Sequence, residues 1–391
     1  MPSRIHWNPA LDALPFSPIR RMFNKAATMS DVLHLSIGQP DFPAPQHVVE
    51  AHIQALRDGR TRYELDAGLP QLRQAIAHFY NQRYGIDTLT ENHVLITTGC
   101  CQAMYLALMG ATRPGKKVIV IEPVFVLAHI IRAAGGEPVP IVTTADHGYQ
   151  VDPQEVIDRM KDDDVCAVML NSPGNPTGTV YPRATIERIC AAAAERGITV
   201  VSDEVYDRLI LDEGAAYASA LNHAPTLDNV IMTSSVSKTY ALAGLRLGWA
   251  ISTPENIETL QRFHMFVSTT ENTPTQWAVL AAFEGDQSPV DAMVAEYRRR
   301  RDRIVELIEQ APHLTGYTPG GAFFVMPSLP AGTDSFDVAM RLLDEAGVCT
   351  VPGGAFGDSC NNALRISYAT SMDVIESAFE RIIPWLEKQS F

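Results

Sequence analysis

Five short apolar runs separated by helical stretches constrain the fold of this chain more than any other feature. Each run is rich in β-branched residues and is bounded by turn formers, which is typical of buried strands. Their alternation with helices predicts an α/β fold with a mostly parallel sheet covered on both faces. In such sheets ligands bind beyond the carboxyl ends of the strands. The runs are residues 93–99, 117–123, 166–173, 198–204 and 229–235, and the helical stretches include 101–111, 153–161 and 182–196.

A second group of elements follows the predicted sheet. A helix at 290–310 leads to predicted strands and helices that indicate a smaller α+β domain. Upstream, a proline-rich segment up to about residue 44 reads as an irregular arm apart from 33–38, and two amphipathic segments lie between 45 and 84. We predict an arm and part of the small domain at 1–45, a large ligand-binding domain at 46–290 and a small domain at 291–391. The strands of the small domain are predicted at 320–329, 348–353 and 363–369, and its helices at 336–345 and 372–388.

Charge and cysteine usage exclude several classes of protein. With 31 Lys and Arg against 45 Asp and Glu in 391 residues, the net charge is −14, which disfavours nucleic acid as a partner. The basic run at 298–303 is best interpreted as a solvated or ion-paired helix face. The six cysteines lack metal-ligand spacing, so we expect neither a metal site nor a disulfide scaffold. No stretch is long and apolar enough for a signal peptide or a membrane span, and we expect a cytoplasmic protein without a membrane partner.

The stretch 234–249, SSVSKTYALAGLRLGW, carries the most chemical information. Lys238 lies just after an apolar run, and a lysine that loses its proton near neutral pH can form a Schiff base with a carbonyl. Ser235 and Ser237 offer hydroxyls, and Arg246 offers a cationic fork suited to phosphate. An aldehyde that carries a phosphate fits both halves, and pyridoxal 5′-phosphate is such a molecule. The alternative is a solvated surface lysine.

Three polar residues lie at or just beyond the ends of other predicted strands. Asn175, in NSPGNPTG, offers an amide to a ligand oxygen or forms an Asx-turn. Asp203, in SDEVY, suits a protonated pyridine nitrogen or caps a helix. Tyr206 offers a hydroxyl to a ring oxygen or is a half-buried packing residue.

Further candidates come from the first predicted strand end and from the C-terminal region. Gly99, Cys100 and Cys101 join a strand to a helix start, where free N–H groups favour phosphate, although such a turn also has a purely structural role. Phe125 either stacks on a planar ring or belongs to the core. Arg365, in ALRISYA, either clamps a carboxylate or forms a surface ion pair.

The order of NPTG, SDEVY, SVSK, GLRLGW and RISYA resembles fold-type I PLP-dependent aminotransferases of class I/II, in the aspartate, aromatic and kynurenine aminotransferase branch. The resemblance runs from about Leu35 to the C-terminus. It implies that Lys238 is the aldimine lysine and proton shuttle, that Asp203 pairs with the pyridinium nitrogen, and that Tyr206 contacts the cofactor's phenolic oxygen. The further cofactor contacts that it implies are Gly99, Cys100, Cys101, Phe125, Asn175, Ser235, Ser237 and Arg246.

The resemblance also implies a substrate site and a partner. Arg365, with Asn175 and the backbone at Gly38, would bind the substrate α-carboxylate. Tyr63 matches a tyrosine that reaches the cofactor phosphate of the neighbouring subunit, which implies a homodimer with shared active sites. Family members more often have small, hydroxyl or polar residues at Cys100 and Cys101, and 269–276 contains no arginine, so acidic substrates are not implied.

The resulting hypothesis is an aminotransferase that moves an amino group from an L-amino acid to a 2-oxo acid with ping-pong kinetics. The catalytic residues would be Lys238, Asp203 and Tyr206. The nearest alternative is a PLP-dependent C–S or β-eliminating lyase, because the same cofactor serves any Cα carbanion. A catalytically silent PLP-binding protein is the alternative from another class.

Overall fold

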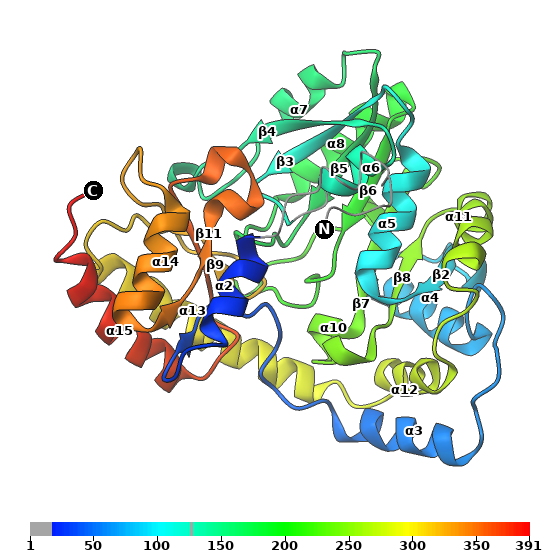
Figure 1. The fold of residues 1–391 in the computed structure, drawn as a ribbon. Coiled ribbons are helices and arrows are strands. Elements are labelled where there is room, and N and C mark those ends of the chain that lie inside the picture. The colour runs from blue at the N-terminus through cyan, green and yellow to red at the C-terminus, as the bar shows by residue number, and fades with distance from the viewer. Residues whose placement is uncertain (1–17, 126–127) are drawn as a thin grey trace, which may run out of the picture.

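The computed structural model describes residues 18–125 and 128–391. At its centre lies a seven-stranded sheet in the order β2-β8-β7-β6-β5-β3-β4 (Figure 1). Adjacent strands from β7 to β4 pair in parallel, whereas β8 is antiparallel to both β2 and β7. The strands are β2 (Val94–Thr97), β3 (Lys117–Glu122), β4 (Glu137–Val142), β5 (Val165–Asn171), β6 (Thr199–Asp203), β7 (Val230–Ser235) and β8 (Gly248–Ile251). The predicted α/β fold is confirmed.

All five predicted runs are strands of this sheet, and two of its strands were missed. β4 contains Pro138 and Pro140, which weaken a strand signal and are tolerated because β4 lies at the sheet edge. β8 is short, and its first two residues belong to the stretch 234–249, which was interpreted only for its chemistry.

Both faces of the sheet are buried, as the alternation of side chains along β3 makes clear. Val118 and Val120 belong to a core cluster that includes α5, whereas Ile119 and Ile121 belong to a cluster that includes α8. Successive side chains of a strand point to opposite faces, so helices cover the sheet on both sides. The helices of this part of the chain are α3 (Gln46–Arg57), α4 (Pro70–Tyr84), α5 (Gly99–Ala111), α6 (Ala128–Ala133), α7 (Pro153–Arg159), α8 (Arg183–Arg196), α9 (Ala220–His223), α10 (Val236–Thr239), α11 (Pro254–Val267) and α12 (Thr273–Glu284).

The C-terminal elements form a separate layer together with residues near the N-terminus (Figure 1). β11, β12 and β9 make a three-stranded antiparallel sheet, and β1 pairs in parallel with β10. Helix α2 lies against β11. The elements are α2 (Pro18–Ala26), β1 (Leu33–His34), α13 (Ser288–Gln310), β9 (Phe324–Val325), α14 (Ser335–Ala346), β10 (Val348–Cys349), β11 (Val351–Pro352), β12 (Leu364–Ser367) and α15 (Met372–Leu386).

Helix α2 corrects the expectation of an irregular arm. Pro18 stands at its first position, where a missing N–H costs nothing and the fixed φ favours a helix. Residues 1–17 of the predicted arm lie outside the described residues, and the domain boundaries at 45/46 and 290/291 stay predictions.

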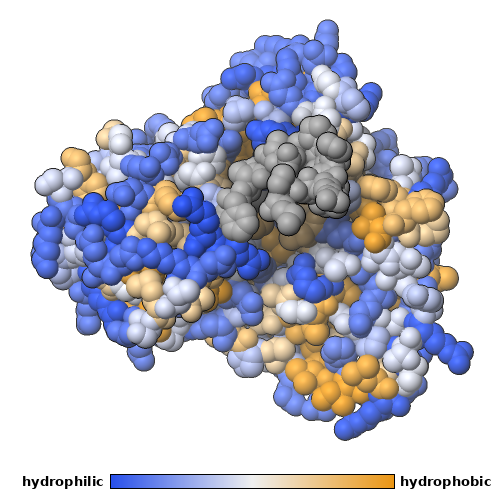
Figure 2. Space-filling view, in the orientation of Figure 1, coloured by the Kyte–Doolittle hydropathy of each residue, from blue (hydrophilic) through white to orange (hydrophobic). Residues whose placement is uncertain are grey.

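The visible surface is mainly hydrophilic, with apolar side chains gathered over α3 and at the end of α11 (Figure 2). None of the described helices combines the length and apolarity that crossing a bilayer requires.

Candidate active site

A cavity of about 340 Å³ opens at the carboxyl ends of the central strands, since Asn171, Asp203 and Ser235, the last residues of β5, β6 and β7, line it. This is the edge where parallel sheets bind ligands. Of the predicted site residues, all but Gly99 and Tyr63 line it. Those that do are Gly38, Cys100, Cys101, Phe125, Asn175, Asp203, Tyr206, Ser235, Ser237, Lys238, Arg246 and Arg365.

Lys238 lies on α10, directly after β7, and its side chain is half-buried rather than solvated. Its Nζ donates a hydrogen bond to the Gly38 carbonyl at 2.5 Å. Burial lowers the pKa of Lys238 to about 8, and the charges of Arg365 and Arg246 act in the same direction. An amine with this pKa loses its proton near neutral pH, as attack on a carbonyl requires.

Asp203 ends β6, between Asn171 of β5 and Thr233 of β7 in the sheet register. Its Oδ1 accepts hydrogen bonds from the Val205 N–H at 3.2 Å and the Cys100 thiol at 3.5 Å. Desolvation raises the pKa of Asp203 to about 6, although these hydrogen bonds oppose the shift. The next described helix is α9, so the helix-cap alternative is wrong. A desolvated carboxylate that faces a cavity suits a cationic ligand atom.

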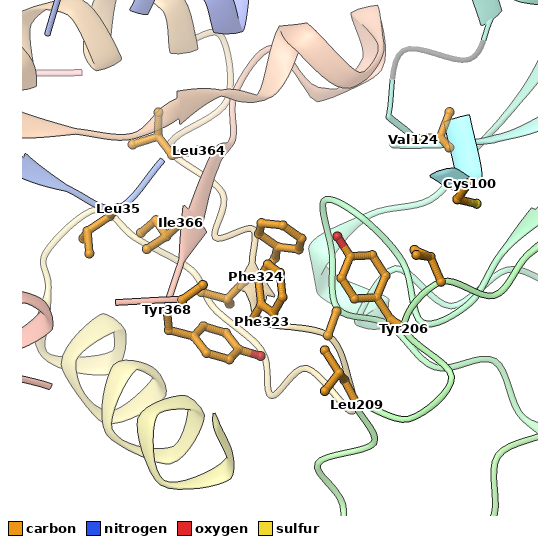
Figure 3. Packing of buried hydrophobic residues seen from close by; sticks show 14 of the residues in the cluster. Leu35, Cys100, Val124, Tyr206, Leu209, Phe323, Phe324, Leu364, Ile366 and Tyr368 are labelled. Atoms are coloured by element: carbon orange, nitrogen blue, oxygen red, sulfur yellow. The ribbon is translucent and has the colours of Figure 1, made fainter. Parts of the chain in front are cut away.

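Tyr206 is buried against two aromatic rings of the C-terminal region. Its ring centroid lies 5.4 Å from that of Phe323 and 6.0 Å from that of Phe324, both edge to face (Figure 3). Burial, followed by the charge of Asp203, raises the pKa of Tyr206 well above its usual value. The hydroxyl therefore stays protonated and can donate into the cavity that Tyr206 lines. Packing and ligand binding are compatible at this residue.

Arg365 of β12 is buried and carries a fixed guanidinium. Nη1 donates to Asn175 Oδ1 at 3.1 Å, and Nη2 donates to the Ser36 carbonyl at 2.6 Å. The group lies 4.6 Å from the Phe324 ring centroid and 5.1 Å from that of Phe356. Its Nε is buried without a partner among the described residues. Arg365 is therefore no surface ion pair, and its fork suits a planar anion in the cavity.

Asn175 directs its amide oxygen at Arg365 and is itself held by its backbone. Its N–H donates to Asn171 Oδ1 at 2.8 Å, and its carbonyl accepts from the Phe125 N–H at 3.1 Å. The amide oxygen of Asn175 thus accepts from Arg365 instead of forming an Asx-turn. Phe125 is 37% exposed and lines the cavity, so it is not a core residue.

Arg246 lies against the beginning of α5. Gly99 has φ +72°, and a Cβ there would lie 2.6 Å from Arg246 Nη2, so glycine is required for this approach. Gly248 has a similar role in β8, because a Cβ there would lie 2.6 Å from the backbone nitrogen of Cys100. Ser235 Oγ accepts from the Ser237 N–H at 3.3 Å. Hydroxyls, a guanidinium and a helix N-terminus thus border the cavity, a combination that suits phosphate.

Tyr63 lies apart from this cavity and is 86% exposed. Tyr63 therefore does not belong to the cavity of its own chain.

Some cavity residues escaped the sequence analysis. Ile19 and Phe23 reach it from α2, which was not recognised as a helix. Nothing in the sequence linked these apolar residues to Lys238, which lies more than 200 positions away. The other missed residues are Ser36, Met104, Val124, Asn171, Val205 and Ala243.

Within residues 18–125 and 128–391, no group of three or more His, Cys, Asp or Glu side chains could hold a metal ion. The six cysteines are free, and all but Cys101 are buried.

The chain matches the family model "Aminotransferase class I and II" over residues 30–382. It therefore belongs to the class I and II aminotransferase family, whose members depend on pyridoxal 5′-phosphate, and it is a transaminase.

Its similarity to individual family members extends over nearly the whole chain. It is 34% identical to an aspartate aminotransferase of Pyrococcus horikoshii over 375 residues, and this matched stretch covers 95% of each chain. It is 31% identical over 370 residues to aromatic-amino-acid aminotransferase 2 of Thermococcus litoralis, covering 94% of each. The crystal structure of an aspartate aminotransferase from Thermotoga maritima has a TM-score of 0.92 and 31% identity, and covers 98% of this chain and 100% of that one.

Proposed function

We propose that the cavity holds pyridoxal 5′-phosphate at Lys238 and transfers an amino group from an L-amino acid to a 2-oxo acid. One observation carries this proposal: a lysine with a pKa of about 8, a desolvated carboxylate and a buried arginine line the same cavity. The residues fit the cofactor. Asp203 would face the ring nitrogen, and Tyr206 would donate to the ring oxygen together with the Asn175 amide.

The phosphate would lie among Ser235, Ser237, Arg246 and the first turn of α5, formed by Gly99, Cys100 and Cys101. Phe125 would stack on the ring from the cavity mouth. These roles agree with the chemistry of the groups, because hydroxyls and N–H groups donate to phosphate and an aromatic face packs on a planar ring.

Bound pyridoxal phosphate supplies a ring that withdraws electrons from the substrate Cα. Asp203 keeps the ring nitrogen protonated, because an ionised carboxylate stabilises the neighbouring positive charge. Arg365 binds the substrate carboxylate, which fixes the direction of the Cα–H bond. The Lys238 amine, which lines the same cavity, would take the proton from Cα as a general base and return it as a general acid. Ping-pong kinetics follow, because the amino group stays on the enzyme between substrates.

We further propose a substrate with an uncharged side chain. Lys238, Arg246 and Arg365 are the cationic side chains among the described cavity residues, and each already has a role above. The remaining wall is largely apolar, with Ile19, Phe23, Met104, Val124 and Phe125. We expect kcat/KM for L-phenylalanine or L-leucine to exceed that for L-aspartate at least tenfold. A preference for aspartate would refute this substrate class and leave transamination intact.

A homodimer with shared active sites is also proposed. Tyr63 and Leu65 are 86% and 57% exposed, and α3 presents Val49, Ile53 and Leu56 to solvent, in the region where Figure 2 has an apolar patch. Exposed apolar groups of this kind mark association surfaces. Analytical ultracentrifugation should give a dimer. Tyr63→Phe should weaken PLP binding without changing its Lys238 linkage. The cytoplasmic location stays a prediction.

The proposed reaction is tested by supplying purified holoenzyme with an amino acid and a 2-oxo acid. Chromatography should detect the new amino acid and the new 2-oxo acid in equal amounts. Release of ammonia and pyruvate without exchange would assign the lyase alternative. PLP binding without turnover of any amino acid would indicate a catalytically silent PLP-binding protein.

A further inference from the structure

Thr98 stands at the N-cap of α5 and yet does not cap this helix. At every other α-helix whose N-cap is a Ser, Thr, Asp or Asn among the described residues, the side chain accepts a hydrogen bond from a first-turn N–H, as expected. Thr253, the same residue type, caps α11 by accepting from the Asn256 N–H at 3.4 Å. The capping residues are Asp152, Ser219, Ser235, Thr253, Asn272, Asp334 and Ser371.

A buried carboxylate holds the Thr98 hydroxyl instead. Thr98 Oγ1 donates to Glu271 Oε2 at 2.5 Å, and Glu271 is only 6% exposed. The second oxygen, Oε1, lies 2.8 Å from Nε2 of the fully buried His264. Since a carboxylate only accepts, the ring N–H of His264 is the donor. Gln276 fixes the backbone of Glu271, because its Nε2 donates to the Glu271 carbonyl at 3.1 Å.

Because Glu271 holds the Thr98 hydroxyl, Thr98 does not cap the beginning of α5. A capping threonine would accept from the N–H of Cys100 or Cys101, the second and third residues of the helix. Both residues line the cavity, and the Arg246 guanidinium lies beside Gly99 at the same helix end. These N–H groups are the ones that a phosphate at this helix end would use. A cap from Thr98 and a phosphate would therefore compete for the same donors.

We infer that Glu271, oriented by His264, is a positioning residue for the phosphate: it holds the Thr98 hydroxyl away from the start of α5 and keeps the Cys100 and Cys101 N–H groups free. The inference rests on the proposed function for the identity of the phosphate compound. A purely electrostatic role of Glu271 predicts the opposite sign, because removal of an anion near a phosphate strengthens phosphate binding.

The test measures dissociation constants of the full-length apo protein for PLP, by absorbance, and for inorganic phosphate, by competition. Glu271→Ala frees Thr98 to cap α5, so both ligands should bind roughly fivefold more weakly, the size of an N-cap contribution. Glu271→Gln should bind nearly as the wild type does, because its amide oxygen can still accept a hydrogen bond from the Thr98 hydroxyl. Thr98→Val should also bind normally, since it removes the competing group.

The double variant Thr98→Val/Glu271→Ala separates positioning from general damage to the structure. Positioning predicts that it binds both ligands as tightly as Thr98→Val alone. Thr253→Val is the matched control, because it deletes a true threonine cap and should lower Tm without changing either dissociation constant.

Two results would overturn the inference: unchanged or tighter binding by Glu271→Ala, or an equal loss on the wild-type and Thr98→Val backgrounds. Failure of the wild-type chain to bind PLP would overturn the proposed function as well. If the wild-type chain binds PLP but transfers no amino group, the dissociation constants of the variants still decide the inference.

Discussion

Replacement of Arg365 by lysine gives a quantitative test of the proposed carboxylate site. The guanidinium is fixed by hydrogen bonds to Asn175 at 3.1 Å and to Ser36 at 2.6 Å, and it packs over Phe324. A lysine retains one positive charge, but a single ammonium cannot reproduce the planar fork that binds a carboxylate with two hydrogen bonds. The variant should therefore bind the carboxylate with one hydrogen bond fewer.

The magnitude follows from the strength of one charge-assisted hydrogen bond. Such a bond contributes about 1.5–3 kcal/mol, so kcat/KM for an amino acid should fall about 10- to 150-fold. Although burial lowers the pKa of Arg365 to about 10, the arginine stays charged at pH 8. Burial shifts a lysine in the same direction from a lower usual value, which places the loss toward the upper end of this range.

The assay compares L-phenylalanine with phenylethylamine, the same amine without a carboxylate, in single-turnover reactions. Wild-type enzyme should favour the amino acid strongly, and Arg365→Lys should lose most of this preference while its dissociation constant for PLP stays unchanged. An unchanged ratio between the two substrates would refute the assignment of Arg365. Weaker PLP binding with an unchanged ratio would assign Arg365 to the cofactor instead.

Three further predictions concern the lysine, the helix start and a buried acid. Lys238→Ala should abolish turnover and the covalent attachment of PLP that borohydride reduction and peptide mass spectrometry detect at Lys238; retained turnover would exclude this lysine. Gly99→Ala, whose Cβ would lie 2.6 Å from Arg246 Nη2, should weaken PLP binding at least tenfold in an absorbance titration, and normal affinity would contradict the described approach of Arg246 to α5. Burial raises the pKa of Glu204 to about 7, so the folded chain binds a proton that the unfolded chain releases, and stability falls as pH rises from about 4 to 7. Glu204→Gln should therefore raise the unfolding free energy of the apo protein by up to about 3 kcal/mol at pH 8 and by much less at pH 5 in urea denaturation, whereas an equal effect at both pH values would contradict the assigned pKa.

The central sheet and the position of the cavity were predictable from local sequence. Each predicted strand was a compact β-branched run, and the motifs that contain Asn175, Asp203 and Lys238 directly followed such runs. Because carboxyl ends of parallel strands share one edge, their side chains had to meet there, as the cavity lining confirms.

The parts that were missed depend on contacts between residues far apart in the chain. Arg365 is separated by 329 positions from Ser36, whose carbonyl fixes it. Thr98 and Glu271 are 173 positions apart, and neither lies in a motif that indicates the contact. Helix α2 is short and follows prolines, so its helical period gave a weak signal, although it supplies Ile19 and Phe23 to the cavity. Local patterns carry no information on such partners.

The most direct measurement is an absorbance titration of the PLP-loaded enzyme with single L-amino acids, followed by single 2-oxo acids. We expect certain amino acids to convert the cofactor to pyridoxamine phosphate, with release of the matching 2-oxo acid, and we expect 2-oxo acids to reverse this change. Neither step should occur with Lys238→Ala. Release of ammonia without formation of pyridoxamine phosphate, or an unchanged spectrum with every amino acid, would contradict amino transfer at this site.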